Sequence, residues 1–174
     1  MVESKNVSLR GKNILGLEYF SADEIELVLQ TAVEMKNIIH RDIKKVPALR
    51  GKAVVNLFYE PSTRTRTSFE LAGKYLGADV INITAGSSSI VKGESLRDTL
   101  YTIEDMGVDA IVMRHKAEGA AEYAAKIVKP VIVLPGTYIQ ILRFIGFFPV
   151  NVIWIFSRKR STVQRANLSC YSPM

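Results

Sequence analysis

A cluster of hydroxyl and guanidinium side chains lies in the segment FYEPSTRTRTSFELAG, residues 58–73. Residues 62–65, Ser-Thr-Arg-Thr, follow an apolar run and precede a helical pattern, so we expect them at a turn from a strand into a helix. The first backbone N–H groups of a helix lack partners within the helix and, together with the helix dipole, form a site for an anion. Hydroxyl groups add donors there, and Arg64 can give a planar, two-pronged contact to a phosphate. The turn therefore predicts a binding site for a small phosphorylated molecule.

Two different interpretations bear on this prediction. A solvated, N-capped helix start with spare arginines would have the same residue types and bind nothing. A nucleotide site would need a different signature, and the sequence contains neither GxxxxGK[ST] nor GxGxxG. Nucleotide-binding folds of those types are therefore not supported.

Two further polar segments could complete the site. The run 84–93 carries Lys92 behind several hydroxyls, and a mobile loop of this kind can fold over a bound anion, although an ordinary surface loop fits the composition as well. Arg114 and His115 end an apolar run, where an arginine could polarise a carbonyl oxygen of a bound ligand. We expect His115 to be an ordinary turn residue and His40, in a charged stretch, to lie on the surface.

The elements that must position these groups alternate between helical patterns and short apolar runs. Ser21 followed by Glu24 is a capping box at the start of the first helix. Short apolar strands linked by helices predict an α/β fold, with a parallel sheet of about four strands flanked by helices. The expected helices are 21–39, 65–76, 94–106 and 118–126, and the expected strands are 53–59, 78–83, 107–113 and 130–134.

The three polar segments all follow strands of this predicted sheet. The turn 62–65 follows the first strand, the loop 84–93 the second and Arg114 the third. Ligands of open parallel sheets bind outside the carboxyl ends of the strands. Polar groups at three successive strand ends therefore predict a single site at that edge, and this is a stronger indication than any one segment alone.

Charge is distributed unevenly along the chain. All 17 acidic residues precede residue 133, whereas the last 42 residues carry five basic side chains and no acid. The net charge of +6 therefore arises mainly from that tail, and not from a basic face of a folded domain, as a nucleic-acid binder would have. We expect one domain at 1–132, an atypical basic and aromatic tail at 133–174 that is not a native domain, and no nucleic-acid partner.

The tail does not have the pattern of a membrane anchor. Its uninterrupted apolar run 144–148 is far shorter than the ~20 residues that a spanning helix needs, so no membrane partner is expected. The start, MVESKNVSLRGKN, lacks the apolar segment of a secretory signal, and the single Cys170 excludes an internal disulfide. A cytoplasmic location is the default expectation.

Three motifs, FYEPSTRTRTSFE, GSSSIVKGESLRDT and VMRHKAEGAA, resemble in this order the amino-terminal domain of aspartate carbamoyltransferase catalytic chains. The resemblance covers roughly residues 8–132. The STRTR turn is typical of carbamoyltransferases in general, whereas the SSSxxKGESLxDT loop resembles the aspartate branch. The resemblance implies a carbamoyl phosphate-binding domain of an enzyme that transfers the carbamoyl group to L-aspartate. The products would be N-carbamoyl-L-aspartate and phosphate, in pyrimidine biosynthesis, with no cofactor or metal.

The resemblance also implies roles for single residues. The predicted ligands of carbamoyl phosphate are Ser62, Thr63, Arg64, Thr65 and Arg114, with Thr65 and Arg114 near its carbonyl oxygen. Arg64, Thr65 and Arg114 are the predicted catalytic residues. In the reaction, the aspartate amine attacks the carbamoyl carbon, an oxyanion forms and phosphate leaves. Cationic and hydroxyl donors can stabilise both the oxyanion and the departing phosphate.

Other carried-over residues imply an assembly. Ser88 (or Ser89, since the alignment shifts by one) and Lys92 resemble loop residues that reach into the site of a neighbouring subunit. That sharing implies a homotrimer. Glu60 resembles the acidic residue that links the two domains of the family's enzymes when these domains close.

Beyond about residue 133 the resemblance ends. In the family the fourth strand leads to a His-Pro-Thr-Gln motif whose His and Gln contact the carbamoyl group. This chain instead reads PVIVLPGTYIQILRF, and no histidine follows His115. The family's second domain, which binds aspartate, has no counterpart either. The abrupt change suggests a frameshift near codon 133, which resequencing the gene would test.

Several functions remain open at this point. The resemblance favours an aspartate carbamoyltransferase by lineage. The missing groups favour, for this chain itself, a catalytically inactive fragment that at most binds carbamoyl phosphate or phosphate. An ornithine-type carbamoyltransferase is also open, as is a membrane or partner-binding role of the tail.

Overall fold

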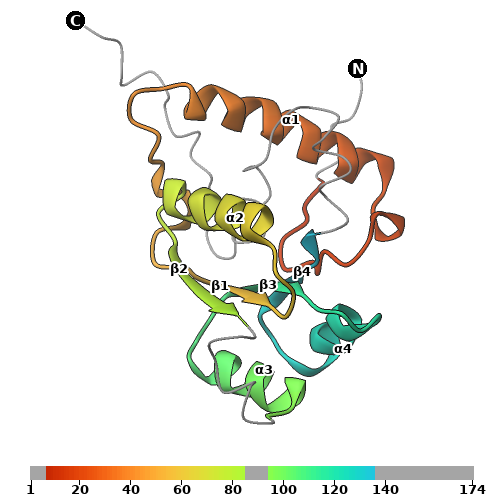
Figure 1. Cartoon of the computed structure of the whole chain (residues 1–174). Helices are drawn as coiled ribbons and strands as arrows, with labels where there is room; N and C mark the ends of the chain where they lie inside the picture. The colour runs from red at the N-terminus through yellow and green to blue at the C-terminus, as the bar shows by residue number, and fades with distance from the viewer. Residues whose placement is uncertain (1–6, 85–93, 136–174) are drawn as a thin grey trace, which may run out of the picture.

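The computed structural model of the 174-residue chain describes residues 7–84 and 94–135. At its centre is a four-stranded parallel sheet in the order β2-β1-β3-β4 (Figure 1). The α/β fold predicted from the sequence is therefore confirmed. The strands are β1 (Ala53–Phe58), β2 (Asp79–Thr84), β3 (Ala110–Arg114) and β4 (Val131–Val133).

Helices cover both faces of the sheet (Figure 1). One face carries α1 (Ala22–Ile39) and α2 (Thr63–Tyr75), and the other carries α3 (Leu96–Asp105) and α4 (Ala120–Ile127). The short 3-10 helices η1 (Leu17–Tyr19) and η2 (Pro47–Leu49) flank α1 in the chain. Every predicted helix and strand is present, with ends within three residues of those expected.

The largest shift in a predicted boundary is at β3, which begins at residue 110 instead of 107. Gly107 has a φ of 75°, and its N–H donates to the Glu104 carbonyl at 2.9 Å, so it still belongs to the turn that ends α3. Apolar residues after such a turn belong to a strand only from the point at which they pair with the neighbouring strand. The apolar run alone therefore overestimated the length of β3.

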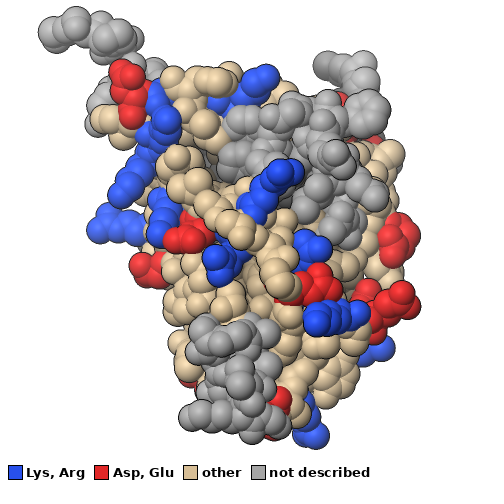
Figure 2. All heavy atoms as spheres, viewed as in Figure 1, with Lys and Arg blue, Asp and Glu red and all other residues tan. Residues whose placement is uncertain are grey.

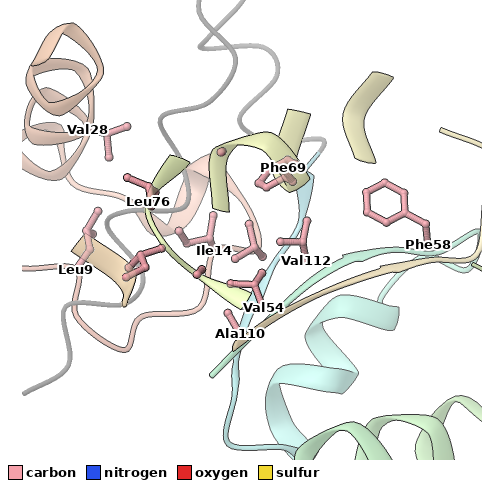
Figure 3. Close-up of a cluster of buried hydrophobic side chains, with 13 residues drawn as sticks. Leu9, Ile14, Val28, Val54, Phe58, Phe69, Leu76, Ala110 and Val112 are labelled. Atoms are coloured by element: carbon pink, nitrogen blue, oxygen red, sulfur yellow. The ribbon is translucent and has the colours of Figure 1, made fainter. Parts of the chain in front are cut away.

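β1 is buried on both faces, as its apolar sequence predicted. Val54 and Phe58 belong to the core beneath α1 and α2, whereas Val55 and Leu57 belong to the core against α3 and α4. This division follows from the alternation of side chains along a strand. Figure 3 shows the first of these two cores, in which side chains of the N-terminal segment, both helices and the strands meet.

The two edges of the sheet differ. β2 is one edge, and its Ile81 side chain remains 46% exposed. At the other edge Ile14 forms a parallel bridge with Val133. The Ile14 N–H donates to the Ile132 carbonyl at 2.8 Å, and the Leu134 N–H donates to the Ile14 carbonyl at 2.8 Å. The N-terminal segment, for which no element was predicted, thus extends the sheet beyond β4.

Within residues 7–84 and 94–135, no helix is long and apolar enough to cross a membrane. Nearly all of the predicted tail, from residue 136 onward, lies outside the described residues. The domain boundary at residue 132 therefore stays a prediction.

Candidate anion-binding site

The predicted phosphate ligands lie at the start of α2, immediately after the carboxyl end of β1. Ser62 is the N-cap residue and is half-buried, whereas Thr63 and Arg64 are exposed. Thr65, at the third helical position, is buried with only 5% of its surface exposed. The structure therefore gathers these four residues on one helical turn at the edge where the sequence predicted a ligand.

Ser62 does not cap its helix, although it occupies the N-cap position. At α1 the Ser21 hydroxyl accepts from the Glu24 N–H at 3.3 Å, and at α3 the Ser95 hydroxyl accepts from the Asp98 N–H at 3.2 Å. The first turns of α1 and α3 also contain acidic residues, whereas that of α2 contains none. The start of α2 thus keeps both its uncapped N–H groups and its positive dipole end.

Arg114 joins this turn from the end of β3. Its Nη1 donates to the Ser62 hydroxyl at 3.0 Å and its Nε donates to Glu60 Oε2 at 2.9 Å. The Tyr59 N–H donates to the Arg114 carbonyl at 2.8 Å, which fixes the two strand ends beside each other. The predicted meeting of the first and third strand ends is confirmed. The intramolecular ion pair with Glu60 was not predicted.

A hollow of about 540 Å³ opens beside the turn, between it and the end of β2. Arg66 and Thr84 line this hollow together with Glu60, Ser62 and Thr63. The sequence prediction assigned no role to Arg66 or Thr84. Residues two apart on a helix point to nearly opposite sides, so the TRTR spacing already implied that its two arginines serve different surroundings.

His115 is an ordinary turn residue, as predicted. Its Nδ1 accepts from the Ala117 N–H at 2.9 Å, and its ring packs at 4.5 Å against that of Tyr59. His40 follows α1 and is exposed, also as predicted.

Tyr59 has a buried hydroxyl with no hydrogen-bond partner among the described residues. Burial raises the pKa of this phenol, and the Glu94 carboxylate adds to the rise. The nearby Thr99 hydroxyl opposes the rise, but no bond of ordinary geometry joins it to Tyr59. Tyr59 therefore remains a neutral residue at ordinary pH and packs against the core of α3 and α4.

Ser88, Ser89 and Lys92 lie outside the described residues, so their predicted reach into another site is not addressed by the structure.

On the face that Figure 2 presents, Lys and Arg side chains are interspersed with Asp and Glu. That face therefore has no broad basic field, and the positive groups at the turn are the start of α2 and the arginines beside it.

The model of the family "Aspartate/ornithine carbamoyltransferase, carbamoyl-P binding domain" matches residues 12–137. The chain belongs to this family. The match begins four residues later and ends five residues later than the range of resemblance expected from the motifs. It is confined to the carbamoyl-P binding domain.

Curated relatives of this carbamoyltransferase domain are named as aspartate carbamoyltransferase catalytic subunits. The chain is 59% identical to that of Desulforamulus reducens over 125 residues, covering 72% of this chain and 40% of the relative. It is 62% identical to that of Heliobacterium modesticaldum over 125 residues, with the same shares. The chain thus spans about 40% of the length of the relatives that it matches.

Solved structures agree with the fold. The catalytic subunit of the M. jannaschii aspartate transcarbamoylase matches with a TM-score of 0.64 and 41% identity, over 70% of this chain and 40% of that one. Aspartate transcarbamoylase from Trypanosoma cruzi, solved in complex with carbamoyl phosphate, matches with a TM-score of 0.67 and 36% identity, over 72% and 40%. The resemblance to the aspartate branch is therefore confirmed for this domain.

Proposed function

We propose that this carbamoyltransferase domain binds carbamoyl phosphate at the start of α2. The observation that carries the proposal is that α2 begins without a side-chain cap and without an acid, while Arg114 crosses to its N-cap hydroxyl at 3.0 Å. Such a start offers backbone N–H groups, hydroxyls and guanidinium groups to an anion. The T. cruzi relative, whose solved structure holds carbamoyl phosphate, supports the choice of ligand.

The proposed ligand contacts are those that the resemblance to the family implies, and the bond between Ser62 and Arg114 supports them. The phosphate would lie against the first turn of α2, with the contacts coming from Ser62, Thr63, Arg64 and Thr65. Arg114 and the Thr65 hydroxyl would face the carbonyl oxygen. Because Glu60 holds Arg114 at 2.9 Å, a bound anion would compete with this carboxylate for the guanidinium.

In the complete enzyme the proposed reaction is carbamoyl transfer to L-aspartate, as the names of the relatives indicate. The amine nitrogen would form a bond to the carbamoyl carbon, and the bond from that carbon to the phosphate oxygen would break. The phosphate would leave with the electron pair, and the amine would give up a proton. Arg114 and Thr65 would stabilise the oxyanion, and Arg64 the departing phosphate.

For this chain alone we propose binding without turnover. No histidine follows His115, and residues 133–147 read VLPGTYIQILRFIGF where the family carries His-Pro-Thr-Gln.

Ser88 and Lys92 would serve a neighbouring site in a homotrimer. Analytical ultracentrifugation would detect this assembly as a species of three times the chain mass.

Calorimetric titration with carbamoyl phosphate tests the binding proposal. We expect heat of binding for the wild-type chain and an affinity lower by about tenfold or more for Arg64→Ala, since a charge-assisted contact is lost. Arg50→Ala is the matched comparison, because it removes the same group at an exposed residue after η2 that does not line the hollow. The absence of binding to the wild-type chain would overturn the proposal, and equal affinities of Arg64→Ala and wild type would remove Arg64 from the site.

An assay with radiolabelled carbamoyl phosphate and L-aspartate tests the proposal that the chain does not turn over. We expect no labelled N-carbamoyl-L-aspartate above the uncatalysed background. Robust turnover by the 174-residue chain would show that the groups present here suffice for catalysis.

A further inference from the structure

A polar side chain is buried in the middle of the central strand. Asn56 in β1 is 0% exposed, and the residues on both sides of it in the strand are apolar core residues. Its Nδ2 donates to Asn82 Oδ1 at 2.9 Å, whereas its own Oδ1 has no hydrogen-bond partner among the described residues. An incompletely satisfied buried amide is unfavourable compared with an apolar residue, and such departures from a well-packed core are expected mainly where they serve a function.

The hydrogen bonds continue from Asn56 across the sheet to α2. Asn82 lies beside Asn56 in the register of β1 and β2, so both side chains point to the face that α2 covers. Asn82 Nδ2 donates to Glu70 Oε2 at 2.8 Å, and Lys74 Nζ donates to Glu70 Oε1 at 2.6 Å. The bonds to Lys74 and then Asn82 lower the pKa of Glu70, so this carboxylate stays charged as the final acceptor.

The same stretch of α2 lies very close to β2. A Cβ atom added to Gly73 would come within 2.4 Å of Val80 Cγ2, so the helix backbone packs directly on this strand. Close packing sets the distance between helix and strand, but a glycine contact resists rotation of the helix about its axis only weakly. The bond from Asn82 to Glu70 supplies a directional contact at this point.

Glu70 and Thr63, the first helical residue, lie on one side of α2. Thr63 precedes Glu70 by seven residues, which is close to two full turns, or about 10 Å along the axis. A rotation of α2 that moved Glu70 away from Asn82 would carry Thr63 with it. The position of the first turn relative to Arg114 therefore depends on how Glu70 is held.

We propose that Asn56, Asn82 and Glu70 are positioning residues of the anion site, and that their hydrogen bonds fix the rotation of α2 so that its first turn faces Arg114. The inference rests on the proposed function, since it concerns the same site. It assigns no contact with the ligand to any of the three residues.

The decisive variant is the double substitution Asn56→Val with Asn82→Val. Valine suits a strand, and removing both partners leaves neither amide unpaired, so we expect the urea unfolding midpoint to be unchanged or higher. Titration with inorganic phosphate should nevertheless show an affinity about fivefold lower or more, as for residues that orient a ligand's direct partners. A purely structural pair would leave the phosphate affinity as it is, so equal affinity in the two proteins would overturn the proposal.

Substitutions at Glu70 provide the matched controls. Glu70→Gln keeps an oxygen that can accept from Asn82 and should retain most of the phosphate affinity, whereas Glu70→Leu should lose it. Lys74→Gln removes the other partner of Glu70 and leaves the amide chain intact, so it should bind as wild type does. If Glu70→Leu bound phosphate as tightly as Glu70→Gln, the contact with Asn82 would not be what positions the helix.

Hydrogen exchange of the ligand-free chain separates this inference from the proposed function. We expect the amides at the start of α2 to exchange faster in the double variant, with the α1 amides unchanged as an internal reference. Failure of the wild-type chain to bind carbamoyl phosphate would overturn the proposed function, and hydrogen exchange would then test the positioning by itself. Unchanged exchange throughout α2 would overturn the positioning itself.

Discussion

The starts of α1 and α2 have the same residue at the N-cap position and opposite surroundings. At α1 the Ser21 hydroxyl accepts from the Glu24 N–H, and the Glu24 carboxylate accepts in return from the Ser21 N–H at 2.7 Å. At α2 the Ser62 hydroxyl instead accepts from Arg114, and the first turn lacks any acid. A helix start that satisfies its own N–H groups contributes to stability, whereas one that leaves them unsatisfied is available to a ligand.

The most direct way to break this contrast is to give α2 an acid like those of α1. Thr63→Asp should reduce the affinity for carbamoyl phosphate by more than about tenfold, because a carboxylate would occupy the place of the ligand anion. The same substitution should raise the urea unfolding midpoint slightly, since an acid suits a helix start. Thr63→Asn is the control for shape without charge. Equal affinities of the Asp and Asn variants would contradict an anion site at this turn.

Removing Arg114 should weaken binding next most. Arg114→Gln deletes a guanidinium and also leaves Glu60 without its ion pair beside the site. We expect an affinity for phosphate about tenfold lower by calorimetry, as for the loss of a charge-assisted contact. Arg50→Gln makes the same change in net charge at an exposed residue after η2 and should bind as wild type does. A similar loss in both variants would indicate a general electrostatic effect.

Substitution of Ser21 by alanine should affect mainly the stability, and substitution of Ser62 mainly the binding of phosphate. Ser21→Ala should lower the free energy of unfolding by about 1 kcal/mol, as the loss of an N-cap does, and leave phosphate binding intact. Ser62→Ala should change the stability less, because that hydroxyl caps nothing, and should weaken phosphate binding. Urea denaturation and calorimetry on both variants provide the comparison. Loss of stability at Ser62 equal to that at Ser21 would mean that the two helix starts do not differ.

The smallest expected effect is the contribution of the α1 capping box to the pH dependence of stability. The hydrogen bond from Lys12, followed by that from the Ser21 N–H, lowers the pKa of Glu24 below its usual 4.5. A lowered pKa in the folded state gives stability that is present above pH 4.5 and is lost as the pH falls through the folded value. Glu24→Gln should therefore flatten the acid limb of the unfolding curve, measured by circular dichroism. An unchanged limb would show that Glu24 does not contribute to acid unfolding.

Much of the fold could be predicted from the sequence because its pattern is local. Apolar runs and helical spacing located every strand and α-helix of the described residues, whereas the two short 3-10 helices were not predicted. The bridge between Ile14 and Val133 could not be predicted in this way, since a single bridging residue has no period to detect. The edge position of β2 also depends on the order of the strands, which a pattern along the chain does not contain.

For the site, the sequence predicted the place better than the contacts. The convergence of Ser62 and Arg114 followed from both lying at carboxyl ends of strands. Their direct bond, and the pairing of Arg114 with Glu60, depend on side-chain geometry across two strands. The interpretation as an N-capped start was wrong in one respect, because Ser62 lies at the cap but its hydroxyl is directed to Arg114.

The bridge at Ile14 has a consequence for the order of events during synthesis. The Asn13 side chain accepts from the Ile132 N–H across a separation of 119 residues. A ribosome adding about 5 to 20 residues per second needs roughly 6 to 24 s to make the chain between them. During that interval the N-terminal segment emerges without its partner strand. Closing this edge of the sheet is therefore a late event in the biogenesis of the domain, and a chaperone that shields the nascent segment would act in that interval.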